Sequence, residues 1–249
     1  MQLIFSTWKE VEKYLKRSKG IIVPIGSTEQ HGPTGWFGTD TFCAEVMAEE
    51  FGKATGALVG PAISVGMSVH HTAFPGSISL RPTTLIQAIV DYISCLTRYG
   101  FERFFIVNGH GGNGSAIHSA SWEIYAKAPE MKVKHPERVW IDSINWWDLP
   151  SVAKMKDKMF GKKDGGHATP AELSVAMYAH QERRMNLKKL PPWRKTRNTG
   201  YGPLDFRASY PDGRLWSTPE LARVEHGRRL VRAAVKDFVP MYKTFLKRK

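Results

Sequence analysis

Short apolar runs alternate with amphipathic stretches along this chain, and this alternation restricts its fold more than any other feature. The apolar runs at 20–26 and 103–107 have the length of buried strands, and the stretches between them have the length and polarity of surface helices. Strands that alternate with helices favour a mostly parallel sheet with helices on both faces. We therefore expect an α/β protein whose polar motifs gather beyond the carboxyl ends of the strands.

The expected elements follow from local patterns. Thr7 and Glu10 have the capping-box spacing that opens a first helix. Residues 191–217 are rich in proline and glycine, so we expect no regular element there, and we expect this segment to drape over the body or to reach a neighbouring subunit. Helices are predicted at about 7–17, 40–53 and 82–99, and strands at 20–26, 57–60, 103–107 and 138–144.

The composition excludes a membrane-spanning chain. Hydrophobic residues make up 42% of the 249 residues, and no uninterrupted apolar stretch approaches the roughly 20 residues that cross a bilayer. Residues 1–19 carry acidic and basic side chains where a signal peptide needs an apolar run, so we expect a cytoplasmic protein. Two cysteines, Cys43 and Cys95, cannot form a disulfide framework and are expected to be buried thiols.

The net charge of +13 raises the question of a nucleic-acid partner. Residues 181–200 hold seven basic and one acidic residue, and residues 222–249 hold nine basic and two acidic residues. These two windows account for the whole excess, so the rest of the chain is neutral. A basic helix face is usually just solvated, and nucleic-acid binding is therefore kept only as an alternative.

Glu29, His31 and Asp40 form the first polar cluster, immediately after the first predicted strand. In an extended segment residues i and i+2 face the same way, so Glu29 and His31 point together, and Asp40 can return to them at the mouth of the next helix. Carboxylate oxygens and an imidazole suit Zn, Mn or Fe in the divalent state. The structural alternative is that Asp40 caps its helix and His31 donates to a loop carbonyl.

The third strand ends in a second glycine-rich loop, residues 108–114, with His110 at its centre. Glycines let the backbone take tight or left-handed conformations, so the loop can carry His110 close to a metal or substrate. The dinucleotide fingerprint, G-x-G-x-x-G, would open a helix and be followed by an acidic residue about 20 positions on; here His110 sits in the middle of the loop, so nucleotide binding is not favoured.

A third polar cluster lies at residues 164–172. Thr169 is the expected N-cap of a helix that starts at Pro170, so Glu172 has a structural explanation as a capping-box acid. His167 follows two glycines and has no equally good structural explanation, which makes it a candidate proton carrier. His70 and His71 lie in a predicted loop and could line a pocket, although paired loop histidines are more often exposed.

Taken together and in order, these motifs resemble the creatininase (creatinine amidohydrolase) family. The Asn-Gly-His-Gly-Gly-Asn form of the second loop resembles the deformylase-like branches more than creatininase proper. The resemblance covers about residues 20–177 and implies a single three-layer α/β/α domain, residues 1–249, that assembles into homohexamers. The matching segments are 26–33, 38–40, 74–80, 108–113 and 166–168, with Glu172.

The resemblance also implies an activity and a set of site residues. The family hydrolyses non-peptide amide C–N bonds, such as the cyclic amide of creatinine or a formamide, with metal-activated water. Carried over by position, Glu29, Asp40 and His110 hold one divalent metal, Zn, Mn or Fe. His31 and Asp40 hold a second metal, so that Asp40 bridges the two, and His167 is the catalytic histidine.

Two positions depart from creatininase proper and disfavour creatinine as the substrate. The first is Gly112, where creatininase has a glutamate that serves the second metal, and the second is the loop 161–164, where creatininase has a tryptophan. Glu172 is the nearest candidate to replace the missing carboxylate or to assist His167. A glutamate at position 112 is expected to tighten the second metal if the loop tolerates a side chain.

The expected partner is a small-molecule amide. Two other functions stay open at this point: a homologue that binds a metal or a ligand without catalysis, and, less favoured, a basic nucleic-acid-binding protein. The first would hold one cation per chain and hydrolyse nothing, and the second would show salt-dependent retention on nucleic acid.

Overall fold

The computed structural model describes residues 1–127, 138–196 and 202–248. Its sheet is parallel, with the strand order β2-β1-β3-β4. In this register Ile25 at the end of β1 pairs with Asn108 at the end of β3, which in turn pairs with Asn145 at the end of β4. The strands are β1 (Gly20–Ile25), β2 (Leu58–Val59), β3 (Arg103–Asn108) and β4 (Trp140–Asn145).

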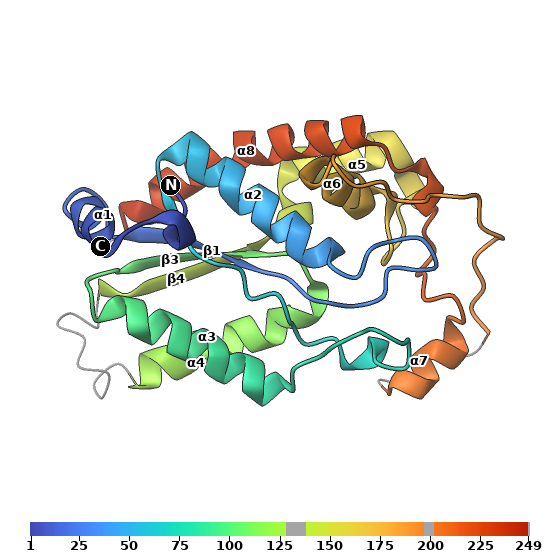
Figure 1. The fold of residues 1–249 in the computed structure, drawn as a ribbon, viewed down its shortest axis with the longest axis horizontal. Helices are drawn as coiled ribbons and strands as arrows, with labels where there is room; N and C mark the ends of the chain where they lie inside the picture. Colours follow the sequence, from blue (N-terminus) through green and yellow to red (C-terminus); the bar gives the residue numbers. More distant parts are fainter. Residues whose placement is uncertain (128–137, 197–201, 249) are drawn as a thin grey trace.

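Helices cover both faces of this sheet, so that the described residues form three layers (Figure 1). One face carries α2 (Thr39–Thr55), α5 (Pro150–Phe160), α6 (Pro170–Ala179) and α8 (Val224–Leu246), and the other carries α3 (Pro82–Thr97) and α4 (Gly114–Lys127). The predicted α/β class with a mostly parallel sheet between two helical layers is confirmed.

The core consists of two apolar clusters, one on each face of the sheet. Successive side chains of a strand point to opposite faces. Ile22 and Phe105 therefore pack into the cluster that contains α2 and α8, while Ile21 and Phe104 pack into the cluster that contains α3 and α4. The two central strands, β1 and β3, are buried on both sides, which is why their sequences read as continuous apolar runs, whereas the edge strand β4 is only half-buried and includes Asp142 and Ser143.

Most predicted elements are present, with differences at their ends. Helix α1 (Trp8–Leu15) opens with the predicted capping box between Thr7 and Glu10, and it ends two residues before the predicted end at Arg17. The prediction that residues 191–217 hold no regular element is wrong, because α7 (Pro203–Ser209) begins there with a proline in its first turn. Short 3₁₀ segments complete the chain: η1 (Leu3–Phe5), η2 (Val69–His71), η3 (Gly111–Asn113), η5 (Trp146–Asp148), η6 (Gly161–Lys163) and η7 (Pro219–Leu221).

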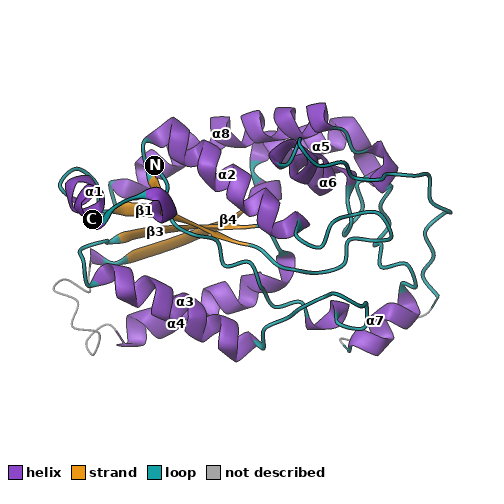
Figure 2. Ribbon diagram, viewed as in Figure 1, coloured by secondary structure: helices purple, strands orange, loops and turns teal. Residues whose placement is uncertain are grey.

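The loops that leave β1 and β3 lie at the same edge of the sheet, together with η2 and α7 (Figure 2). This is the carboxyl edge, where ligands bind in parallel sheets.

Of the two cysteines, Cys43 is buried as predicted, but Cys95 is exposed on α3, so the prediction was wrong for Cys95. Among the described residues, none of the helices has both the length and the apolar character needed to cross a membrane.

Candidate metal centre

A close approach between the loop after β1 and the first turn of α2 builds the centre. Gly26 lies against the backbone of Thr41, and a Cβ atom at position 26 would collide with it. Glycine at this position therefore lets the loop run directly over the start of α2. The N-cap of α2 is Gly38, which makes no side-chain capping bond, so the alternative that Asp40 caps the helix is not what the structure shows. Instead Asp40 is buried and faces the loop.

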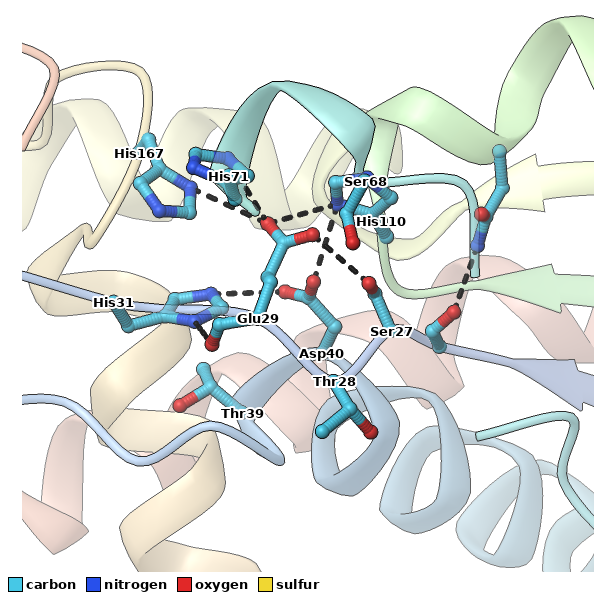
Figure 3. Close-up of polar contacts among 12 residues, drawn as sticks. Ser27, Thr28, Glu29, His31, Thr39, Asp40, Ser68, His71, His110 and His167 are labelled. Atoms are coloured by element: carbon cyan, nitrogen blue, oxygen red, sulfur yellow. Dashed lines mark hydrogen bonds and ion pairs between the residues drawn. The ribbon is translucent and has the colours of Figure 1, made fainter. Parts of the chain in front are cut away.

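Three predicted ligands meet around the carboxylate of Asp40. Its Oδ1 lies 3.0 Å from His31 Nε2, and its Oδ2 lies 3.1 Å from His110 Nδ1. Glu29 Oε1 lies 3.2 Å from the same nitrogen of His110. All four side chains are buried. Figure 3 shows the carboxylates of Glu29 and Asp40 surrounded by imidazole rings, those of His31, His71, His110 and His167.

Backbone carbonyls fix how three of these rings are turned. His31 donates Nδ1–H to the carbonyl of Glu29 at 3.1 Å, and His110 donates Nε2–H to the carbonyl of Met67 at 3.1 Å. His167 donates Nε2–H to the carbonyl of Gln30 at 2.7 Å. A ring whose remote nitrogen is protonated and anchored in this way keeps its other nitrogen for a metal or a proton. His31 therefore does donate to a loop carbonyl, as the structural alternative proposed. This bond leaves Nε2 of the ring facing the carboxylates of Asp40 and Glu172.

The electrostatics of the cluster fit a cation. Glu29 Oε1 and Asp40 Oδ2 are buried and face imidazole nitrogens at 3.1 to 3.3 Å, and burial of carboxylate oxygens is costly unless a positive charge compensates them. Burial raises the pKa of Glu29. Burial opposes a charge on His31, but the Asp40 carboxylate outweighs it and raises the pKa of that ring to about 10. Glu29 and Asp40 likewise raise the pKa of His110 against the effect of burial, so the carboxylates of this cluster favour a positive charge beside them.

Glu172 has two roles in the structure. Its side chain accepts the backbone N–H of Thr169, and the Thr169 hydroxyl accepts the N–H of Glu172, which is the predicted capping box. The same carboxylate lies 3.9 Å from His31 Nε2. Burial raises the pKa of Glu172 to about 7. The helix cap thus places a second carboxylate beside His31.

Among the described residues, three combinations of these side chains bring one donor atom each to within 4.8 Å of one another. They are Glu29 with Asp40 and His110, His31 with Asp40 and Glu172, and Glu29 with His31 and His167. The first two share Asp40, as the bridging arrangement requires. The third is centred on His167, whose Nδ1 lies 3.8 Å from Glu29 Oε1.

His71 belongs to the centre, although the sequence favoured an exposed loop position. Its Nε2 lies 3.3 Å from Glu29 Oε1, and its ring stacks on that of His167 with centroids 4.3 Å apart. The ring is buried because Phe206 of α7 covers it at 4.7 Å. Residues 191–217 were expected to drape over the body or to reach a neighbouring subunit. The first part is met, since α7 of this segment lies over η2 and covers the site at His71.

A cavity of about 390 Å³ opens beside these residues. Trp146 and Trp147, directly after β4, line one wall with Lys156 of α5, whose ammonium group pairs with Asp164 at 3.1 Å. Sequence reasoning missed these three residues. Their place after the carboxyl end of a strand was a signal for the tryptophans, while nothing local marks Lys156. Predicted site residues that line the same cavity are Asp40, His110, His167 and Glu172.

The loop around His110 leaves no room for a side chain at position 112. A Cβ atom on Gly112 would collide with His110 Nε2 and with the carbonyl of Met67, the two atoms that form the anchoring hydrogen bond. A glutamate there was expected to tighten a second metal only if the loop tolerates a side chain, and this condition is not met.

A family model described as creatinine amidohydrolase matches residues 5–242, nearly the whole chain. The chain belongs to the creatininase family. The expected resemblance is thus confirmed, and solved creatininase structures share the fold: a manganese form of creatininase superposes with a TM-score of 0.84 at 21% identity and covers 99% of both chains. A creatinine amidohydrolase homologue from Bacteroides fragilis superposes with a TM-score of 0.75 at 22% identity, over 100% of this chain and 97% of the other.

Relatives of this creatininase-family chain carry several activities. It is 31% identical over 192 residues to the 3-dehydro-scyllo-inosose hydrolase of Thermotoga maritima, which covers 71% of this chain and 57% of that protein. It is 39% identical over 106 residues to the mycofactocin precursor peptide peptidase of Mycolicibacterium smegmatis, covering 40% and 42%. It is 31% identical over 117 residues to the creatinine amidohydrolase of Pseudomonas putida, covering 45% of each. The matched region thus spans little more than half the length of the first relative.

Proposed function

We propose that this protein is a metal-dependent hydrolase that cleaves a non-peptide amide C–N bond of a small molecule. The observation that carries the proposal is the convergence of Glu29, Asp40 and His110, whose buried side chains bring one donor atom each to within 4.8 Å of one another. The relatives named above are hydrolases, which supports a hydrolytic reaction. Family membership supports amide chemistry.

The donor set suits divalent zinc, manganese or iron, because it combines imidazole nitrogen with carboxylate oxygen. Glu29, Asp40 and His110 would hold the first ion, and His31, Asp40 and Glu172 would hold the second. Glu172 then supplies the carboxylate that position 112 cannot supply. Solved relatives described as manganese and Zn–Zn forms of creatininase support this choice of metals.

Such ions, when bound, polarise the substrate carbonyl and lower the pKa of water to near neutrality. The chain's own groups then manage the protons. His167 keeps Nε2–H on the carbonyl of Gln30, so Nδ1 is the atom at which it receives a proton from water and returns it to the leaving nitrogen. Glu172 lies 3.9 Å from His31 Nε2, where its carboxylate can balance a positive charge on that ring.

The cavity limits what can react. A volume of about 390 Å³ suits a small molecule, and Trp146 and Trp147 offer flat apolar surface to a ring or a planar amide. The ammonium group of Lys156 offers a hydrogen-bond donor for an oxygen of the substrate. Homohexameric assembly, a cytoplasmic location and a single domain over residues 1–249 are part of the same proposal and rest on the family resemblance and the sequence.

Elemental analysis of the purified protein, followed by a hydrolysis screen, tests the proposal. We expect one or two equivalents of zinc, manganese or iron per chain, and turnover of a formamide, a lactam or creatinine that stops with a chelator and returns with the metal. A metal-loaded protein that hydrolyses none of these compounds would favour the non-catalytic alternative. Salt-dependent retention on nucleic acid, without hydrolysis, would favour the other alternative.

A further inference from the structure

The side-chain amide of Gln30 has one possible orientation. Its Oε1 accepts the backbone N–H of Gly32 at 2.8 Å, and its Nε2 donates to the backbone carbonyl of Gly213 at 3.1 Å. Because a backbone N–H only donates and a carbonyl only accepts, exchange of the amide oxygen and nitrogen would break both bonds. Gln30 is buried, so no water replaces these partners. One hydrogen of Nε2 is thereby used, and one remains.

The remaining hydrogen faces two imidazole nitrogens. His71 Nδ1 lies 2.9 Å from Gln30 Nε2, and His167 Nε2 lies 3.0 Å from it. However, His167 Nε2 also lies 2.7 Å from the backbone carbonyl of Gln30, which can only accept. His167 Nε2 must therefore carry a hydrogen, and it cannot accept another from the amide. The second amide hydrogen consequently goes to His71 Nδ1.

These assignments determine which ring nitrogen of His71 and of His167 faces Glu29, and whether that nitrogen carries a hydrogen. Since His71 Nδ1 accepts, the single hydrogen of that ring is on Nε2, which lies 3.3 Å from Glu29 Oε1. His71 therefore faces the carboxylate with a positive N–H dipole. His167, whose Nε2–H is held by the carbonyl, turns Nδ1 toward the same oxygen at 3.8 Å. One residue thus controls two rings, through its side chain for His71 and through its backbone for His167.

We propose that Gln30 is a positioning residue that sets the tautomer of His71 through its side-chain amide and that of His167 through its backbone carbonyl. The inference deepens the proposed function and rests on it. Partners that fix the tautomer of a ring also fix the atom through which that ring acts. A carboxylate in place of the amide would reverse the hydrogen bond to His71.

Gly213 supports the amide of Gln30 through its backbone carbonyl. Its φ of +82° lies in the left-handed region, and a Cβ atom at this position would collide with the side chain of Gln30. The carbonyl that fixes Gln30 therefore belongs to a turn that tolerates only glycine. This turn is part of the segment 191–217. That segment supplies no predicted ligand, but its Gly213 carbonyl completes the hydrogen bonds of the Gln30 amide.

Long-range ¹H–¹⁵N spectroscopy of the imidazole rings tests the proposal on zinc-loaded protein. In the wild type we expect His71 and His167 each to carry hydrogen on Nε2 only. In Gln30→Glu we expect His71 Nδ1 to gain a hydrogen, because a carboxylate oxygen now accepts from it. His167 should keep its Nε2–H, because the backbone carbonyl is unchanged. Ser77→Ala, which removes the hydroxyl that accepts the backbone N–H of Gln30, is the control and should leave both tautomers unchanged.

A hydrogen on Nδ1 of His71 in the wild type would overturn the proposal, even if Gln30→Glu failed to fold. An unprotonated His71 Nδ1 in a folded Gln30→Glu protein would overturn it as well. Failure of the proposed function would give a different result, because the protein would then bind no zinc. The spectrum of the metal-free protein would still report the tautomers of His71 and His167, since Gln30 sets them without the ion.

Discussion

His110 donates Nε2–H to the backbone carbonyl of Met67 at 3.1 Å, and this single bond aims Nδ1 at both Glu29 and Asp40. The segment containing Met67 lies 43 residues before the histidine, so two distant loops must meet to form it. Gly112 packs directly over this bond. The geometry of the candidate metal centre therefore depends on Gly112, a position that supplies none of the proposed ligands.

Gly112→Ala should weaken the first metal site without unfolding the protein. The added Cβ forces His110 or Met67 to move, and loss of a partner that orients a metal ligand typically costs about 10- to 100-fold in affinity. Gly111→Ala is the matched control, because its Cβ would meet no described atom within 4 Å. Calorimetric titration of zinc into both variants measures the affinity of the first site. Equal affinities would show that His110 does not need this anchor.

Asp40→Ala should lose both cations, because Asp40 is the carboxylate shared by the two ligand sets. No other single substitution at the centre should lower the metal content as much. Glu45→Gln on the same helix, outside the cluster, should keep both ions. Plasma emission spectrometry of the purified variants measures the content, and near wild-type metal in Asp40→Ala would rule out the bridging role.

Glu172→Gln should weaken the second metal and spare the first. Glutamine retains the ability to cap the helix at this position but lacks the charge that faces His31. Thr169→Ala gives the opposite pattern: both affinities stay, while the free energy of unfolding falls by about 1 kcal/mol because the cap is lost. Two equally tight sites in Glu172→Gln would show that another residue holds the second ion.

His167→Ala should keep its metal and lose turnover of whichever compound the screen identifies. The ring is assigned to proton transfer, a role that contributes about 10²- to 10⁴-fold to the rate. Metal content and the rate constant kcat are measured on the same preparation. Loss of the metal would instead make His167 a ligand together with Glu29 and His31, the third combination that the geometry allows.

Metal affinity should rise with pH. Despite burial, Asp40 raises the pKa of His31 to about 10, and Glu29 and Asp40 raise the pKa of His110, so both rings of the metal-free protein are protonated at neutral pH. A metal must displace these protons, and each displaced proton tightens the affinity by about tenfold per pH unit. Burial raises the pKa of Glu172 to about 7, which steepens the dependence of the second site below that pH.

The same pKa shift has the opposite effect on the metal-free fold. A ring whose pKa is higher in the folded state stabilises that state below its unfolded pKa, about 6.5, and His31 loses this contribution as the pH rises through about 10. Competition with a chelator between about pH 6 and pH 8 measures the affinity, and thermal unfolding with and without zinc measures the stability. An affinity independent of pH would contradict the protonation of both rings.

The sequence by itself determined most of the elements and the first three residues of the candidate centre. Buried parallel strands read as apolar runs, and the capping boxes of Thr7 and Thr169 are local patterns that the structure reproduces. Glu29, His31 and Asp40 lie within twelve residues, so strand geometry and a helix start were enough to predict that they meet. Local sequence patterns predict these features because the residues that make the contacts lie close together along the chain.

Only the tertiary structure decided which groups surround those ligands. Glu172 reaches His31, and Gln30 reaches His71, across long stretches of chain, and no local pattern encodes such distances. The burial of His71 depends on α7, and the intolerance of position 112 depends on the carbonyl of Met67. Close packing between distant loops fixes the hydrogen-bond partner of each ring, and that partner decides which nitrogen faces the centre.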